Sequence, residues 1–265
     1  MTQRHHSQSL ADAIPTPPVV GLLREARVAM DLAIGLRHAP VLLQSPRGNG
    51  EPVLLLPGFT AGDASMWPLR QCLGALGWNA RGWGLGRNRG DAPRLLPRVI
   101  EVTERLARET GMRVRMVGWS MGGFLAREAA RDRPELVERI VTFGTPVVGG
   151  PKYTTTAPLF RRLGFDLDAI ERECEERARR PIDVPVTAIY SRRDGVVAWR
   201  ACLDHTSRDV EHVEVESTHG GLGFDSRVWA IVADRLARVR AARARIVEEP
   251  DPDALDALAV PTPAG

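Results

Sequence analysis

Short apolar runs alternate along the chain with longer segments whose apolar positions recur every three to four residues. The continuous run Val53–Leu56 is typical of a strand that is covered on both faces. Further strands are expected over 41–43, 79–83, 114–117, 140–143, 186–190 and 210–215. Helical spacing predicts helices over 19–36, 66–76, 93–110, 121–131 and 228–245. This alternation predicts an α/β fold in which a mostly parallel sheet carries helices on both faces.

The two ends of the chain differ from its middle in composition. Residues 1–18 finish in a proline-rich run and are expected to be a flexible lead, and the Pro-, Ala- and Asp-rich stretch 248–265 is expected to be a disordered tail. We therefore expect one α/β domain over 19–247. Within it, an insertion over about 146–185 is longer than an ordinary loop of about 4–6 residues. Apolar spacing predicts short helices over 159–163 and 167–179, which we interpret as a small helical lid.

Composition excludes several classes of protein. An apolar share of 43% and a charged share of 26% are ordinary for a globular chain and exclude a mostly disordered one. No apolar run approaches the roughly 20 residues of a membrane span, and the polar start leads into no apolar signal segment. The net charge of +3 comes from arginines interspersed with acidic residues, which indicates a mixed solvated surface rather than a nucleic-acid interface. Three scattered cysteines (Cys72, Cys174, Cys202) without metal-ligand spacing favour a reducing, cytoplasmic location.

The segment Gly118–Gly122 holds the candidate nucleophile. Its sequence Gly-Trp-Ser-Met-Gly fits G-x-S-x-G and lies between a strand expected to end at Val117 and a helix expected to begin at Met121. Such a sharp turn forces its central residue into a strained backbone and lifts the Ser120 hydroxyl clear of the chain. The alternative, a serine helix cap beside packing glycines, is disfavoured by this strand–turn–helix setting.

A serine hydroxyl is a poor nucleophile at neutral pH, so Ser120 requires a base and an orienting acid. The candidate base is His219, in a glycine-rich loop between the last strand and the last helix, where an imidazole can reach over the sheet edge. Structural or solvent roles are expected for His5, His6, His38, His205 and His212. The candidate acid is Asp194, in the turn after 186–190. A turn aspartate before glycine is common, but the chain order nucleophile, acid, base favours Asp194, with Asp225 as the reserve.

Acyl transfer also requires donors for the negative charge that develops on a carbonyl oxygen. Each preorganised N–H group is worth about 3–4 kcal/mol. One expected donor is the backbone N–H of Met121, at the positive end of its helix. The other is the N–H of Phe59, in the loop after the first strand, with Thr60 as the alternate. A plain Pro-Gly turn is the alternative explanation for this loop, and it is weakened because the loop follows the strand expected to feed the site.

Four motifs together resemble the α/β-hydrolase superfamily over about residues 40–245. They are the loop Pro57-Gly58-Phe59, the turn around Ser120, the turn Asp194-Gly195-Val196-Val197 and the loop His219–Gly223. The run Gly-Trp-Ser-Met-Gly-Gly, with Phe143–Pro146, is similar to lipase and esterase members, and Trp83–Asn88 is similar to a loop of small bacterial lipase-like proteins. Pro57 departs from the histidine that many members carry before this glycine. The resemblance thus implies a short oxyanion loop, often linked to medium or long acyl chains.

Apolar side chains are expected to form the substrate pocket. Trp67 and Trp119 neighbour the expected site loops, and Phe160 and Leu163, with Phe165 and Leu167, lie on the expected lid. Such residues suit an acyl chain or an aromatic ester. Core packing explains each of them equally well.

These residues favour a serine hydrolase that cleaves carboxylic esters through an acyl-enzyme on Ser120. The expected substrate is a small-molecule ester with an apolar acyl group, and no metal, organic cofactor or nucleic acid is implied. An acyltransferase or thioesterase with the same triad stays open. A non-catalytic hydrolase-like binding protein is disfavoured by the complete triad, and a dehalogenase or epoxide hydrolase by the serine at a position where those members use aspartate.

Overall fold

The centre of the molecule is a six-stranded parallel sheet. The computed structural model describes residues 14–17, 25, 42 and 44–238. The strands are β1 (Pro52–Leu56), β2 (Asn79–Gly82), β3 (Val114–Trp119), β4 (Val137–Phe143), β5 (Val186–Ser191) and β6 (Val210–Val215). They lie in the order β2-β1-β3-β4-β5-β6, and every neighbouring pair is parallel. The predicted fold class is therefore confirmed.

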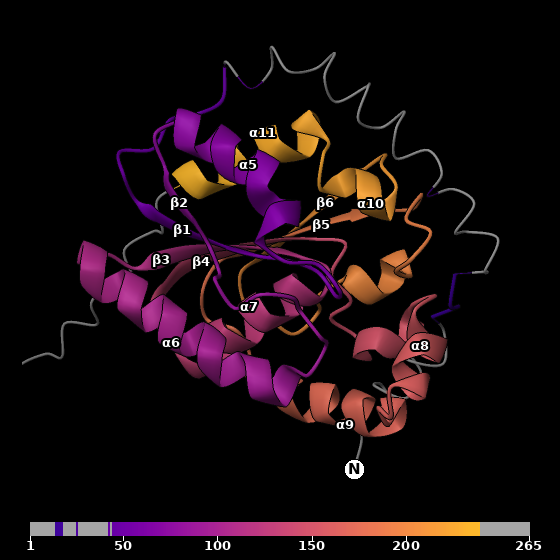
Figure 1. Cartoon of the computed structure of the whole chain (residues 1–265). Helices are drawn as coiled ribbons and strands as arrows, with labels where there is room; N and C mark the ends of the chain where they lie inside the picture. The colour runs from indigo at the N-terminus through magenta and orange to yellow at the C-terminus, as the bar shows by residue number, and fades with distance from the viewer. Residues whose placement is uncertain (1–13, 18–24, 26–41, 43, 239–265) are drawn as a thin grey trace, which may run out of the picture.

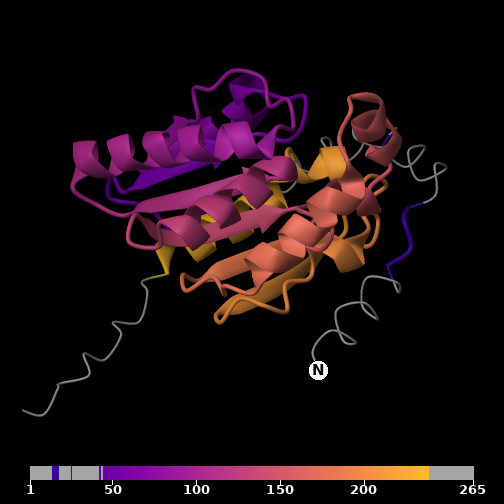
Figure 2. The same cartoon turned by 90° about the horizontal axis from the view of Figure 1, so that it is seen from below.

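Helices cover both faces of this sheet. Figure 1 shows α5 (Asp63–Ala75) and α11 (Ser226–Ala237) on one face, and α6 (Ala92–Thr110) and α7 (Met121–Asp132) on the other. Figure 2, seen from below, places α6, α7 and α9 (Leu167–Ala178) on the near side. Within residues 44–238 the remaining helices are α8 (Ala157–Arg162), the single turn α10 (His219–Leu222), and the 3-10 helices Gly150–Tyr153 and Trp199–Cys202.

The strand β1 shows why the sheet needs two helical layers. All of Val53–Leu56 are 0% exposed. Successive side chains of a strand point to opposite faces, so Leu54 and Leu56 pack with residues of α6 and α7, whereas Val53 and Leu55 pack with residues of α5 and α11. A continuous apolar run is therefore the pattern that this position in the sheet requires.

Most predicted elements match observed ones, with shifted ends. Helix α5 begins at Asp63 and strand β4 at Val137, each three residues before the predicted start. The loop around His219 contains the unpredicted turn α10, whose start is capped by the Thr218 side chain. The predicted segments 19–36 and 41–43 lie outside the described residues apart from residues 25 and 42, as do the tail 248–265 and most of the lead 1–18.

The sheet order places a topological switch between β1 and β3. From β1 the chain passes to β2 on one side, and it then crosses to β3 on the other side. Loops that leave the carboxyl ends of two such strands diverge and open a crevice where ligands bind in α/β sheets. The loop after β1 carries Phe59, and the turn after β3 is Ser120.

The segment between β4 and β5 forms a helical cap beside this crevice. It contains α8 and α9, which confirms the two predicted short helices. Arg177 of α9 pairs with the buried Glu128 and with Asp132 of α7, the latter at 2.9 Å, so charged hydrogen bonds fasten the cap to the domain. Over residues 44–238, together with the few described before them, no helix has the length and apolarity that crossing a bilayer demands.

Candidate active site

Ser120 occupies a strained turn between β3 and α7. Its φ of 52° and ψ of −122° fall where a side chain is rarely tolerated, and its backbone N–H donates to Phe143 O at 2.9 Å. The turn brings chains into close contact, because a Cβ on Gly122 would overlap the Leu56 carbonyl and one on Gly118 would overlap Gly123. These glycines are thus required by packing, as the sequence predicts.

His219 and Asp194 meet at the carboxyl end of the sheet. The imidazole Nδ1 lies 2.7 Å from Oδ2 of Asp194. The other carboxylate oxygen, Oδ1, accepts hydrogen bonds from the N–H groups of Val196 (2.8 Å) and Val197 (2.7 Å). Only 1% of the Asp194 side chain and 12% of the His219 side chain are exposed. The carboxylate is therefore held on both sides, and one oxygen is left for the imidazole.

The end of β4 brings this pair and Ser120 to the same place. Ser120 is hydrogen-bonded to Phe143, and the next residue, Gly144, lies against the His219 ring, since a Cβ there would come within 2.9 Å of Nδ1. The Trp119 ring, directly before Ser120, has its centroid 6.1 Å from that of His219. The three candidate residues thus gather around the carboxyl ends of β3, β4 and β5.

The environment of His219 raises its pKa above the ordinary value. Burial of the ring lowers the pKa, but the charge and hydrogen bond of Asp194, together with the charge of Glu25, outweigh that effect. The surrounding charges therefore favour the protonated form of the His219 ring.

The reserve acid and the other described histidines have different partners. The carboxylate of Asp225 is buried, caps α11 and pairs with Arg227 at 2.6 Å. His212 accepts a hydrogen bond at its Nε2 from the N–H of Asp204, and His205 lies beside it. His5, His6 and His38 lie outside the described residues.

The loop after β1 forms a tight turn in which Phe59 is a better candidate than Thr60 for the predicted anion donor. Ala61 N–H donates to Gly58 O, and Thr60, at a φ of 64°, donates its own N–H to Asn88 O at 2.7 Å. The Thr60 donor is thus already used. In the described part of the chain, neither the Phe59 N–H nor the Met121 N–H donates to a backbone or side-chain acceptor.

Asn88 holds this loop in place, a role that the sequence analysis missed. Its side chain is 0% exposed, donates to Pro57 O at 2.9 Å and accepts from Gly90 N–H at 3.0 Å. Its backbone N–H donates to Ala61 O at 2.8 Å. A polar residue at the end of a glycine-rich loop is the only local signal, and it does not say which loop it contacts.

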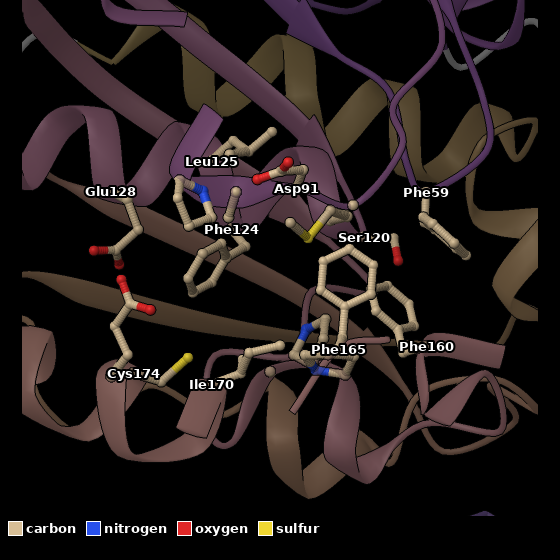
Figure 3. Close-up of a pocket in the computed structure, with 18 of the residues that line it drawn as sticks. Phe59, Asp91, Ser120, Phe124, Leu125, Glu128, Phe160, Phe165, Ile170 and Cys174 are labelled. Carbon is tan, nitrogen blue, oxygen red and sulfur yellow. The ribbon is translucent and has the colours of Figure 1, made fainter. Parts of the chain in front are cut away.

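An apolar cavity of about 220 Å³ opens beside Ser120. Figure 3 shows Phe59 and Ser120 at one end, Phe160 and Phe165 on the cap side, and Phe124 across the middle. The Phe160 ring packs against Phe59 with centroids 4.4 Å apart. The cavity reaches Ile170 and Leu125 and ends at charged groups, since Glu128, Glu173 and Arg177 complete its wall.

Some of the residues predicted to bind substrate line the cavity in the structure, and others do not. Phe160 and Phe165 line the cavity. Trp119 lies outside that wall, with its ring beside His219 and Phe224. Trp67 and Leu163 are 52% and 55% exposed and form no part of the lining, because α5 turns Trp67 to solvent and Leu163 lies at the exposed end of α8. Phe124 and Ile170 line the cavity without having been singled out from the sequence.

The fold of this chain is similar to that of several solved structures. No protein-family model and no curated protein sequence matches the chain. One of the metagenome-derived lipolytic enzymes LipS and LipT is 18% identical, with a TM-score of 0.55 over 72% of this chain and 94% of that chain. The chain has the α/β-hydrolase fold.

Two further α/β-hydrolase structures agree with this assignment. A hydrolase of this superfamily from Oenococcus oeni PSU-1 is 14% identical, with a TM-score of 0.52 over 71% of this chain and 92% of that chain. Lipase B from Aspergillus fumigatus is 17% identical, with a TM-score of 0.52 over 72% of this chain but 53% of that chain. At these identities the likeness concerns the α/β-hydrolase fold alone.

Cys174 is the one thiol in the cavity wall among the described residues. Burial, with the charges of Glu128 and other carboxylates, raises its pKa to about 12. A thiol with that pKa carries almost no thiolate at neutral pH. Ser120 is therefore the candidate nucleophile of this α/β-hydrolase fold.

Proposed function

We propose that the protein is a serine hydrolase that cleaves carboxylic esters with an apolar acyl group. One observation carries the proposal: a serine in a strained strand-to-helix turn opens into an apolar cavity beside a buried His–Asp pair. The strain at Ser120 costs free energy that the fold must offset, and such strain concentrates at functional sites.

The proposed mechanism assigns one role to each group. Ser120 Oγ attacks the ester carbonyl carbon, while His219 Nε2 takes the hydroxyl proton and then delivers it to the leaving alkoxide. Asp194 keeps the proton on Nδ1 and stabilises the imidazolium. Water then attacks the acyl-enzyme, and His219 again acts as the base.

The N–H groups of Met121 and Phe59 are the proposed donors to the oxyanion. Met121 is the first residue of α7, so its N–H lies at the positive end of the helix dipole. The Phe59 N–H is favoured because the neighbouring Thr60 N–H is bonded to Asn88. Each donor is expected to contribute about 3–4 kcal/mol to the transition state.

The cavity is the proposed acyl site. Its wall is mostly aromatic and aliphatic, and it reaches from Ser120 past Phe124 to Ile170. Each methylene buried there is worth about 0.8 kcal/mol, or about fourfold in kcat/KM. We expect kcat/KM for p-nitrophenyl esters to rise by that factor per carbon and then to fall once the chain reaches the charged wall at Glu128 and Arg177.

A fluorophosphonate probe tests the proposal directly. We expect it to label wild type at Ser120, and we expect Ser120→Ala to lose both labelling and several orders of magnitude in ester turnover. The matched control is Ser65→Ala, which should behave as wild type, because the Ser65 hydroxyl in α5 donates to the carbonyl of the N-cap residue Gly62. Turnover by Ser120→Ala close to that of wild type would refute the assignment.

The same assays separate the alternatives. A thioesterase would prefer an acyl thioester over the oxygen ester of the same acyl group, and an acyltransferase would pass the acyl group to added alcohol faster than to water. A protein that merely binds ligands would show neither labelling nor turnover in any arm.

A further inference from the structure

Glu25 joins the two loops that carry the acid and the base. Its Oε1 accepts hydrogen bonds from the N–H groups of Gly195 and His219, both at 3.0 Å, and its Oε2 accepts one from the N–H of Gly220 at 2.8 Å. The partners lie 170 to 195 residues further along the chain. One carboxylate thus bridges the turn after β5 and the turn after β6.

The hydrogen bonds of Glu25 reach the backbone of His219 itself and of the residue next to Asp194. Gly195 follows Asp194 directly, and His219 is bonded through its own backbone. Hydrogen bonds to a carboxylate are about twice as strong as neutral ones. Glu25 therefore closes a ring that runs from its carboxylate through Gly195 and Asp194 to the imidazole, and back through the His219 N–H.

Helix capping alone does not explain this arrangement. A carboxylate that capped the single turn α10 would need only the N–H groups of His219 and Gly220. The third hydrogen bond, from Gly195, adds nothing to that turn. It does fix the position of the acid loop relative to the base loop.

We propose that Glu25 is a positioning residue that holds the Asp194 and His219 loops in register and adds its negative charge to the field at the imidazole. The inference rests on the proposed serine hydrolase function. Glu25 does not touch the reacting atoms and acts through the His–Asp pair.

The charges around His219 support the electrostatic part. The pKa of His219 is raised although burial lowers it, because the charge and hydrogen bond of Asp194 and the charge of Glu25 favour the protonated ring. The neighbouring Trp119 and Gly144 bring no charge to the ring. Within the part of the chain that the structure describes, the two carboxylates thus account for the raised value.

Removal of the Glu25 charge is expected to shift the pH profile in a defined direction. The neutral imidazole is the base, so activity falls as pH decreases through the pKa of His219. Without the Glu25 charge that pKa is lower, and the acid limb of the pH profile moves to lower pH. A merely structural contact would not move it.

The experiment compares Glu25→Gln and Glu25→Ala with the matched control Glu109→Gln. Glu109→Gln also removes one negative charge, but Glu109 pairs with Arg105 on the exposed last turn of α6, at the opposite end of the sheet. For both Glu25 variants we expect kcat per labelled serine to fall roughly 10- to 100-fold with little change in KM, because loosened loops misplace the base. We also expect their acid limb to move to lower pH, and Glu109→Gln to match wild type in both respects.

Each outcome decides for or against the proposal. Glu25 variants whose kcat and acid limb equal those of Glu109→Gln overturn it, even if their melting temperature falls. An NMR titration of the His219 ring, assigned by its loss in His219→Gln, gives a second readout that needs no turnover. If wild type neither labels nor hydrolyses esters, the proposed function fails, yet a lowered His219 pKa in Glu25→Gln still supports the bridge and an unchanged one overturns it.

Discussion

Replacement of Asp194 by asparagine tests the chemistry of the site at a single atom. Oδ1 of Asp194 accepts two backbone N–H groups, and Oδ2 faces Nδ1 of His219 at 2.7 Å. An asparagine can satisfy the two N–H groups only with its oxygen, which turns its NH₂ group toward the imidazole. Nδ1 must then become the acceptor and the proton moves to Nε2, so the base loses the lone pair that it needs for Ser120.

The size of the effect follows from the same contacts. Charges centred about 4 Å apart interact by about 4 kcal/mol at an effective dielectric constant of about 20, which corresponds to about 10³ in rate. The reversed tautomer adds to this loss, and we expect kcat to fall about 10⁴-fold, or about 5 kcal/mol. Residual activity of Asp194→Asn should also show its acid limb at lower pH, because the carboxylate that raises the pKa of His219 is gone.

The matched control is Asp225→Asn. Its side chain is equally buried, at 1% exposed, but it pairs with Arg227 and caps α11. We expect this variant to lose stability in urea denaturation while it keeps kcat within about tenfold of wild type. A larger loss of kcat in Asp225→Asn than in Asp194→Asn, with both variants folded by circular dichroism, would refute the reasoning.

Three further changes probe the loop, the cavity and the cap. Asn88→Ala leaves the buried Pro57 carbonyl and Gly90 N–H without their partner, so we expect a loss of about 1–3 kcal/mol in chemical denaturation together with a lower kcat/KM; unchanged values for both would argue against its role. Ile170→Trp fills the far part of the cavity, and kcat/KM should fall at least about tenfold for long esters and little for acetate; an equal loss for both lengths would contradict the acyl assignment. Leu163→Ser changes an exposed side chain outside the lining and should leave stability within about 0.5 kcal/mol and kcat/KM unchanged, which thermal melts and the same ester panel check.

Protonation of His219 is expected to stabilise the folded protein and to lower its activity. Because its pKa is raised in the folded state, its contribution to stability is fully present below its unfolded pKa and is lost as pH rises through the folded value. Activity follows the neutral ring and rises over the same interval. A comparison of urea denaturation for wild type and His219→Gln across this interval measures the first effect, and a stability difference that grew with pH would contradict it.

Local sequence determined the fold class and pointed to Ser120 as the candidate nucleophile. An apolar run such as Val53–Leu56 admits few environments other than a strand covered on both faces, and the observed strand is buried throughout. The turn at Ser120 is likewise a local matter, because the glycines at 118 and 122 are needed wherever a strand passes so sharply into a helix. Steric constraints that act within a few residues can be inferred from the local sequence alone.

Tertiary structure decided which distant groups meet. Glu25 and Asn88 are ordinary polar residues in the sequence, and their significance arises only because folding brings Glu25 to the N–H groups of Gly195 and Gly220 and Asn88 to the Pro57 carbonyl. The same holds for Leu163, because apolar character does not say whether the residue that follows the short helix α8 faces the cavity or solvent. Hydrogen-bond partners and helix orientation depend on the packing of all the layers, so no short stretch of sequence encodes them.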